Sequence, residues 1–123
     1  MATLGTLVHM KNINFILEAL AEAKKAYLED EVPIGALIVS PEGAIITRAY
    51  NRVEQDQDPS AHAELLAIRA AARLLQSPRL VDHTLYTTLE PCPMCAQLIA
   101  FARLKTVCFG ALDPKGGGVL HGP

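Results

Sequence analysis

The stretch TLYTTLEPCPMCAQLIAFA, residues 84–102, decides the fold prediction, because it joins a strand-like segment to a helix-like one through a cysteine motif. The β-branched and aromatic residues at 84–89 are typical of a strand. Residues 92–102 are predicted to form a helix, in which Pro93 is acceptable because it falls in the first turn. Cys92 would then be the N-cap of this helix, with Cys95 one turn further in.

The residues before this stretch continue the alternation of helices and strands. Within residues 13–30, apolar side chains recur at helical spacing with Lys and Glu between them, which predicts an amphipathic helix. Short apolar runs at 34–39 and 44–50 flank a turn signal, Ser-Pro-Glu-Gly, at 40–43. They predict two strands that form a hairpin.

The next segment is predicted to be a polar loop over residues 51–59. Ser60 is then expected to cap a helix that runs from Ala61 to about Leu75. Residues 106–109 are predicted to form a fourth strand. Helices that alternate with strands in this way predict an α/β sandwich with a mixed sheet.

A length of 123 residues, half of them hydrophobic, fits a single domain with its own core. Within this domain, residues 1–123, we expect a loose leader at 1–10 and a glycine-rich tail at 113–123. The longest apolar runs are shorter than a membrane span, and the start of the chain lacks the pattern of an export signal. We therefore expect a cytoplasmic protein with no membrane partner. The formal net charge of −2 gives no electrostatic indication of nucleic-acid binding.

The chain has three cysteines. An odd count without an export signal argues against a disulfide framework and favours a metal-binding or catalytic use. Cys108 lies in the predicted strand at 106–109, between two apolar residues, and is expected to be a small core residue.

Two short motifs supply metal-binding and acid–base groups, His-Ala-Glu at 62–64 and Pro-Cys-Pro-Met-Cys at 91–95. One imidazole and two thiolates suit zinc, which accepts nitrogen and sulfur ligands. A fourth strong ligand is missing, and three protein ligands leave one position for water, the pattern of a catalytic zinc. His62, Cys92 and Cys95 are therefore the predicted ligands. The alternative is a redox-active C-x-x-C with an unrelated histidine.

Helix placement explains why this spacing suits a reaction. His62 is predicted in the first turn of its helix, and both helix N-termini would then point at the metal and lower the pKa of the thiols. Zinc makes a bound water more acidic. Glu64 is predicted to take the proton of that water and to pass it to a ring nitrogen and then to departing ammonia. The predicted reaction is the hydrolytic deamination of a base, and zinc nucleobase deaminases share this pair of motifs.

Five stretches, EVPIGA, YNR, AHAE, TLYTTLEPCPMC and FGALDPKGG, resemble the bacterial tRNA-specific adenosine deaminases of the cytidine-deaminase-like superfamily. They lie at residues 31–36, 50–52, 61–64, 84–95 and 109–117. The zinc motifs are common to the superfamily, whereas the first and last stretches are more specific to the tRNA adenosine branch.

This resemblance implies a three-layer α/β/α sandwich, bound Zn²⁺ and conversion of adenosine to inosine at the wobble position of a tRNA anticodon stem-loop. It also implies a homodimer in which both subunits help to hold the RNA. By motif position, Asn51 would contact the flipped base and the backbone of Ala63 would hold its edge. In the family, a fifth strand and a long C-terminal helix follow the glycine-rich stretch, and we expect this sequence to lack both.

Two other functions stay open at the level of sequence. One is a free-base or nucleoside deaminase that acts on guanine or cytosine, because the Cys-Pro-Met-Cys form also occurs in such relatives. The other is a non-catalytic, zinc-stabilised RNA-binding module. Glu64 argues against the module, because a purely structural zinc site has no use for a free carboxylate beside its ligands.

Overall fold

A four-stranded sheet in the order β2-β1-β3-β4 organises residues 13–110, the part of the chain that this computed structural model describes. β1 pairs antiparallel with both β2 and β3, whereas β3 and β4 pair in parallel. The predicted hairpin and the mixed sheet are therefore confirmed. The strands are β1 (Gly35–Val39), β2 (Ile45–Tyr50), β3 (Thr84–Thr87) and β4 (Thr106–Phe109).

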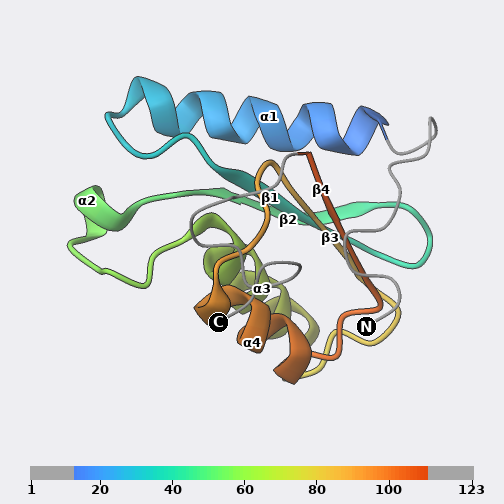
Figure 1. Ribbon diagram of the computed structural model, residues 1–123. Helices are drawn as coiled ribbons and strands as arrows, with labels where there is room; N and C mark the ends of the chain where they lie inside the picture. The colour runs from blue at the N-terminus through green and yellow to red at the C-terminus, as the bar shows by residue number, and fades with distance from the viewer. Residues whose placement is uncertain (1–12, 111–123) are drawn as a thin grey trace.

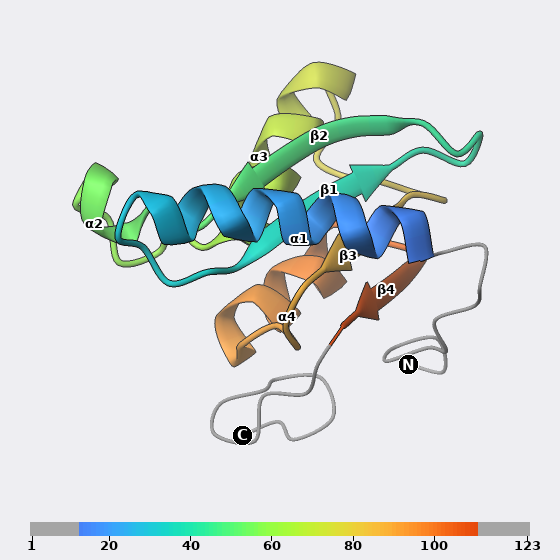
Figure 2. The ribbon, with the colours of Figure 1, turned by 90° about the horizontal axis from the view of Figure 1, so that it is seen from above.

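Helices cover both faces of this sheet (Figures 1 and 2). α1 (Ile13–Leu28) lies along one face, whereas α3 (Ala63–Leu75) and α4 (Pro93–Phe101) lie on the other. A short helix, α2 (Val53–Asp56), lies between β2 and α3 in the sequence. The three layers form the predicted α/β/α sandwich. The leader and the tail expected at the two ends of the chain lie outside the described residues.

Two apolar clusters, one on each face of the sheet, form the core. All five residues of β1 are buried, because the strand contributes to both clusters. Leu37 packs with Tyr86 and Cys108 in the cluster under α1, while Ile38 packs with residues of α3 and α4 in the larger cluster. Cys108 is 2% exposed, so its predicted place in the core is confirmed. Within residues 13–110, no helix is long and apolar enough to cross a bilayer.

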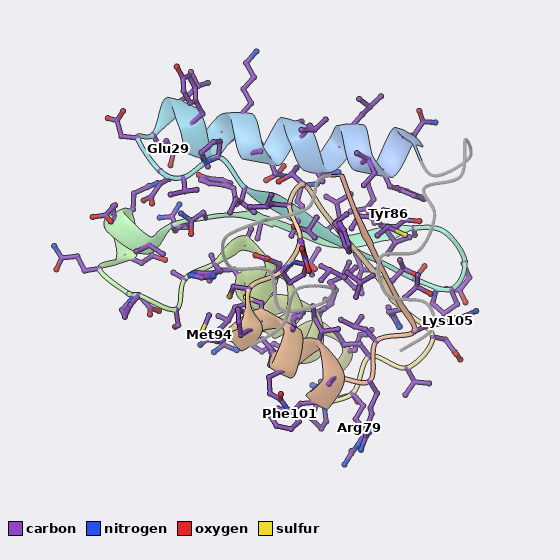
Figure 3. All side chains as sticks on the ribbon, viewed as in Figure 1. Glu29, Arg79, Tyr86, Met94, Phe101 and Lys105 are labelled. Carbon is purple, nitrogen blue, oxygen red and sulfur yellow. The ribbon has the colours of Figure 1, made fainter. Side chains whose placement is uncertain are left out.

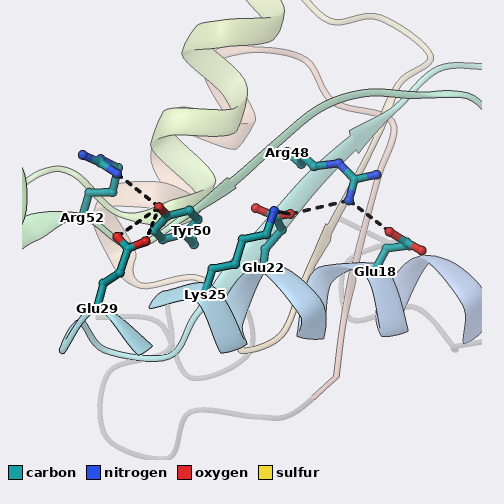
Figure 4. A network of polar contacts seen from close by, with 7 residues as sticks. All are labelled: Glu18, Glu22, Lys25, Glu29, Arg48, Tyr50 and Arg52. Carbon is teal, nitrogen blue, oxygen red and sulfur yellow. Dashed lines mark hydrogen bonds and ion pairs between the residues drawn. The ribbon is translucent and has the colours of Figure 1, made fainter. Parts of the chain in front are cut away.

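Polar contacts tie the edge strand β2 to α1 (Figure 4). Nη1 of Arg48 lies 3.0 Å from Oε1 of Glu18 and 3.5 Å from Oε2 of Glu22. The hydroxyl of Tyr50 donates to the carboxylate of Glu29 at 2.9 Å. These contacts fix the hairpin against the helix at a strand that has no neighbour on its outer side among the described residues.

The segment between β2 and α3 differs from its prediction in two respects. The predicted polar loop contains α2, and α3 begins at Ala63 with His62 as its N-cap. The prediction that Ser60 caps a helix from residue 61 is wrong. Both the amide and the hydroxyl of Ser60 donate to Oδ1 of Asp58, at 2.8 and 2.7 Å, so Ser60 belongs to the turn before the helix.

The described helices α1, α3 and α4 are each followed by a residue with left-handed backbone, although none of these residues is glycine. Asp30, Gln76 and Arg103 have φ values of 61°, 52° and 59°. After α3, the N–H of Ser77 donates to the carbonyl of Ala72 at 3.0 Å, which completes the hydrogen-bonding pattern of a Schellman motif. A side chain at such a position costs free energy that glycine avoids.

We therefore expect Gln76→Gly to raise the free energy of unfolding by about 1 kcal/mol. Gln76 is exposed and lies on the far end of α3 from its N-cap, so catalysis should be unaffected. Chemical denaturation would measure the change. The matched control is Gln97→Gly in the middle of α4, where glycine should instead lower stability by about 1 kcal/mol. Equal effects at the two positions would contradict the backbone argument.

Gly35 lies where α1 crosses the start of β1 at very close range. A Cβ atom at this position would collide with the carbonyl oxygen of Ala19 and would lie 2.5 Å from the amide nitrogen of Ala23. Both are backbone atoms of a helix, so neither can turn aside as a flexible side chain would. Only glycine allows this approach of helix to strand.

Gly35→Ala is expected to lower the free energy of unfolding by about 3 kcal/mol, because α1 must move away from the sheet. A urea titration followed by circular dichroism would measure it. Gly43→Ala is the control, because an added Cβ there meets nothing within 4 Å and costs only the strain of φ +88°, about 1 kcal/mol. An equal loss at both positions would show that contact with α1 is not the cause.

Candidate active site

The starts of two helices bring together three potential metal ligands. His62 is the N-cap of α3, Cys92 is the N-cap of α4, and Cys95 lies in the first turn of α4. Nδ1 of His62 lies 3.5 Å from Sγ of Cys92 and 3.7 Å from Sγ of Cys95. All three ligand atoms are within 4.8 Å of one another. The three residues predicted as ligands from the sequence thus form one cluster.

These separations fit a tetrahedral zinc ion. With Zn–N bonds of about 2.1 Å and Zn–S bonds of about 2.3 Å, tetrahedral angles place a nitrogen ligand and a sulfur ligand roughly 3.6 Å apart. The two N···S distances, 3.5 and 3.7 Å, lie on either side of that value. Within residues 13–110, no fourth His, Cys, Asp or Glu joins the group. The tetrahedron therefore keeps one open position, as in catalytic zinc sites.

The environment of Cys95 favours a cation at this centre. The residue is fully buried, and burial, followed by the negative charges of Glu64 and Cys92, raises the pKa of its thiol. Desolvation is the largest of these influences, and it opposes the lowering of the thiol pKa that is expected from the start of α4. A divalent ion would supply the positive charge that a coordinating thiolate needs here.

Glu64, in the first turn of α3, places a carboxyl group beside the cluster. Its side chain is 3% exposed, and burial raises its pKa to about 7. None of the groups in the described part of the chain hydrogen-bonds its Oε1 atom. A buried carboxyl oxygen without a partner is costly for folding, so it points to a group kept for the chemistry of the site.

A pocket of about 620 Å³ opens beside His62, within the size range of small-molecule sites. Asn51, predicted to contact the substrate base, lines this pocket and is 4% exposed. Ala63 is fully buried as the first residue of α3 and does not line the pocket. The lining residues are Asp30, Glu31, Val32, Ile34, Asn51, Val53, Glu54, Pro59 and His62.

One wall of this pocket, formed by Glu31 and its neighbours with residues of α2, could not be predicted from the sequence. Glu31 lies in the EVPIGA stretch, which is part of the family resemblance. The residues around it in the sequence form no motif that predicts a function for its side chain. The reason is distance along the chain. Its hydrogen-bond partners in α2 are 23 and 24 residues away.

Comparison with known proteins agrees with this geometry. Residues 10–111 match the family described as the cytidine and deoxycytidylate deaminase zinc-binding region. The tRNA-specific adenosine deaminase of Aquifex aeolicus (strain VF5) is 51% identical over 106 residues, which are 86% of this chain and 70% of that protein. Across bacterial proteins of that name at 47 to 52% identity, the chain spans 63 to 71% of their length.

Two solved structures share the fold. A structure from a study of A-to-I editing by tRNA:A34 deaminases matches with a TM-score of 0.83 and 48% identity, over 86% of this chain and 76% of that chain. The guanine deaminase from Bacillus subtilis matches with a TM-score of 0.80 and 41% identity, over 84% of this chain and 66% of that chain. With its zinc-binding motifs and its identity to adenosine-specific relatives, the chain belongs to the tRNA-specific adenosine deaminases of the cytidine and deoxycytidylate deaminase family.

Proposed function

We propose that this protein is a zinc-dependent hydrolytic deaminase that converts adenosine to inosine at the wobble position of a tRNA anticodon. The observation that carries the proposal is the buried carboxyl of Glu64, one oxygen of which has no hydrogen-bond partner among residues 13–110, beside a cluster of three ligands that no fourth residue of this range joins. A structural metal site would need a fourth ligand in place of that carboxyl. Relatives named for deamination of tRNA adenosine supply the substrate class.

The proposed chemistry exchanges the exocyclic amino group of the base for an oxygen atom from water and releases ammonia. When bound, zinc supplies a Lewis acid that makes water a stronger acid. Glu64 takes a proton from the attacking water, delivers one to the ring nitrogen and later protonates the departing amine. Its burial shields these proton transfers from bulk water.

Asn51 and Ala63 are proposed to hold the base during this exchange. Asn51 lies in the pocket wall, where its backbone N–H donates to the carbonyl of Ile34 at 3.1 Å. This anchor leaves the side-chain amide, which carries both donors and an acceptor, to recognise a base. Ala63 offers a backbone N–H that has no acceptor within its own helix, because it is the first helical residue.

An RNA loop suits a site of this kind, because an enzyme must take the base out of its stack before reacting with it. The cost is a few kcal/mol, and it is lowest for a base that is already unpaired. A wobble nucleotide lies in a single-stranded loop, so its adenine is available at low cost.

The second candidate function is the deamination of free guanine. The guanine deaminase from Bacillus subtilis supports it, with 41% identity to this chain and a TM-score of 0.80. The tRNA-directed function has the stronger support, because the relatives named for tRNA reach 51% and 52% identity.

Deamination assays on defined substrates would decide between the functions. The zinc-loaded protein is incubated with an anticodon stem-loop that has adenosine at the wobble position, and separately with guanine and cytosine. We expect inosine in the RNA, detected by nuclease digestion and mass spectrometry, and no ammonia from the free bases. Ammonia only from guanine or cytosine would overturn the tRNA proposal. Stem-loop binding without turnover of any base would favour the RNA-binding module.

We also propose a homodimer in the cytoplasm, with both subunits holding the RNA. α4 presents Met94 at its start and Phe101 near its end (Figure 3), and these side chains are 40% and 68% exposed. They are seven positions apart, which is about two helical turns, so they lie on the same face of the helix. A second copy on this face would cover both, and analytical ultracentrifugation would measure the dimer and its loss in Phe101→Glu.

A further inference from the structure

We propose that Glu31 is a positioning residue that holds α2 in place as a wall of the substrate pocket and thereby sets how tightly the substrate binds. The inference rests on the proposed function, because it concerns the same pocket. It assigns Glu31 no contact with the reacting atoms.

The side chain of Glu31 binds two backbone amides of α2. Oε1 accepts from the N–H of Glu54 at 3.1 Å, and Oε2 accepts from the N–H of Gln55 at 2.7 Å. These are the second and third residues of the helix, whose N–H groups have no acceptor within it. The N-cap residue, Arg52, makes no capping hydrogen bond with its side chain. Glu31 therefore does for α2 what a local cap does for other helices.

The backbone of Glu31 is fixed from the other side. Its N–H donates to the carbonyl of Ala26 in the last turn of α1, at 2.9 Å, and the preceding Asp30 has φ +61°. This is the Schellman motif that also ends α3. The backbone from which the carboxylate projects is therefore held in a fixed position. Glu31 is 5% exposed and thus connects the end of α1 to α2 through a partly buried contact.

A helix as short as α2 depends on such support. It has four residues, and isolated helices of that length are not stable in water. Two of those residues, Val53 and Glu54, line the pocket together with His62. Release of α2 would therefore loosen this part of the wall.

The catalytic cluster has anchors of its own. The carbonyl of His62 accepts from the N–H of Leu66 in α3 at 3.0 Å. The carbonyl of Cys92 accepts from the N–H of Ala96 in α4 at 2.8 Å. Neither bond involves Glu31. Loss of the Glu31 contacts should therefore weaken substrate binding and leave the zinc ligands and Glu64 in place, which predicts a change in KM rather than in kcat.

The charge of Glu31 strengthens the contact. Burial acts to raise its pKa, but the N–H groups of Gln55 and Glu54 together hold the pKa below the ordinary value for a glutamate. The carboxylate is thus ionised at neutral pH, and its hydrogen bonds are of the stronger, charge-assisted kind.

The test compares Glu31→Gln, which keeps one acceptor oxygen, with Glu31→Ala, which removes both. The matched control is Glu29→Gln, the same substitution two residues earlier, where the carboxylate accepts from the Tyr50 hydroxyl outside the pocket (Figure 4). Four quantities are measured for each zinc-loaded protein: amide hydrogen exchange at residues 54 and 55, zinc content, and both kcat and KM on the anticodon stem-loop.

We expect Glu31→Gln to speed exchange at both amides and to raise KM by about tenfold, with kcat within about twofold of wild type and zinc retained. Glu31→Ala should show larger changes of the same kind, and Glu29→Gln should show none. Unchanged exchange would overturn the contact, and faster exchange with unchanged KM would overturn its role in binding. A wild type without turnover refutes the proposed function instead, while the exchange data still decide whether Glu31 holds α2.

Discussion

Replacing Glu64 by alanine is expected to lower kcat by about 10³-fold while zinc stays bound. General acid–base groups contribute roughly 10²- to 10⁴-fold, and Glu64 is assigned several proton transfers. The carboxyls that line the pocket, those of Asp30, Glu31 and Glu54, do not belong to the ligand cluster, so we expect none of them to take over these transfers. Single-turnover deamination of the stem-loop, with zinc measured by mass spectrometry, would give both quantities.

Two controls separate catalysis from folding in this experiment. Glu64→Gln keeps the shape of the side chain but cannot accept and release a proton, so it should be as inactive as the alanine variant. Glu18→Gln changes an exposed carboxylate on α1 and should keep full activity. If Glu64→Gln retained more than about a tenth of wild-type activity, the assignment of Glu64 as proton carrier would be wrong.

Cys95→Ser is expected to remove zinc from the protein and to abolish turnover with it. Serine oxygen is a poor replacement for a thiolate toward zinc, and loss of a direct ligand should exceed the roughly 10- to 100-fold cost of losing an outer partner. Because the ion joins the starts of α3 and α4, we also expect a lower melting temperature that no longer responds to a chelator.

Cys108→Ser is the matched control for this variant. It makes the same exchange of sulfur for oxygen at another buried cysteine, on the face of the sheet that packs under α1. It should lower stability by about 1–3 kcal/mol through its buried hydroxyl, yet keep zinc and the stabilising effect of zinc. Zinc retention in Cys95→Ser would contradict the three-ligand centre.

The sequence was sufficient to predict the strands and the main helices, because their apolar residues repeat with the periods of strands and helices. β1 is a continuous apolar run that is buried on both faces, and its partner β2 follows a clear turn signal. The start of α3 was missed, because Ser60 satisfies its hydrogen bonds with Asp58 instead of capping the helix. Sequence rules for capping could not predict whether the Ser60 hydroxyl would bind Asp58 or an N–H group at the start of the helix.

Only part of the candidate site could be predicted from the sequence. His62, Cys92 and Cys95 could be predicted because residue chemistry and spacing identify metal ligands without a fold. The sequence did not indicate that Nδ1 is the histidine atom at the centre, nor that Glu31 supports α2. Both depend on segments that meet only after folding. A four-residue helix has too few positions to show a periodic pattern, so α2 could not be predicted from the sequence either.

The position of the ligands along the chain has a consequence for how the protein acquires its ion. Cys92 and Cys95 are three residues apart and can capture zinc in a chain that is still largely unfolded. His62 lies 30 residues before Cys92, so it can complete the set only when α3 has docked beside α4. The ion thereby ties together two distant segments, with β3 between them in the sequence, and restricts the unfolded chain much as a covalent cross-link does. Metal capture should thus proceed from a loose two-thiolate complex to the full site, and the late entry of the imidazole would mark the assembly of the helical layer.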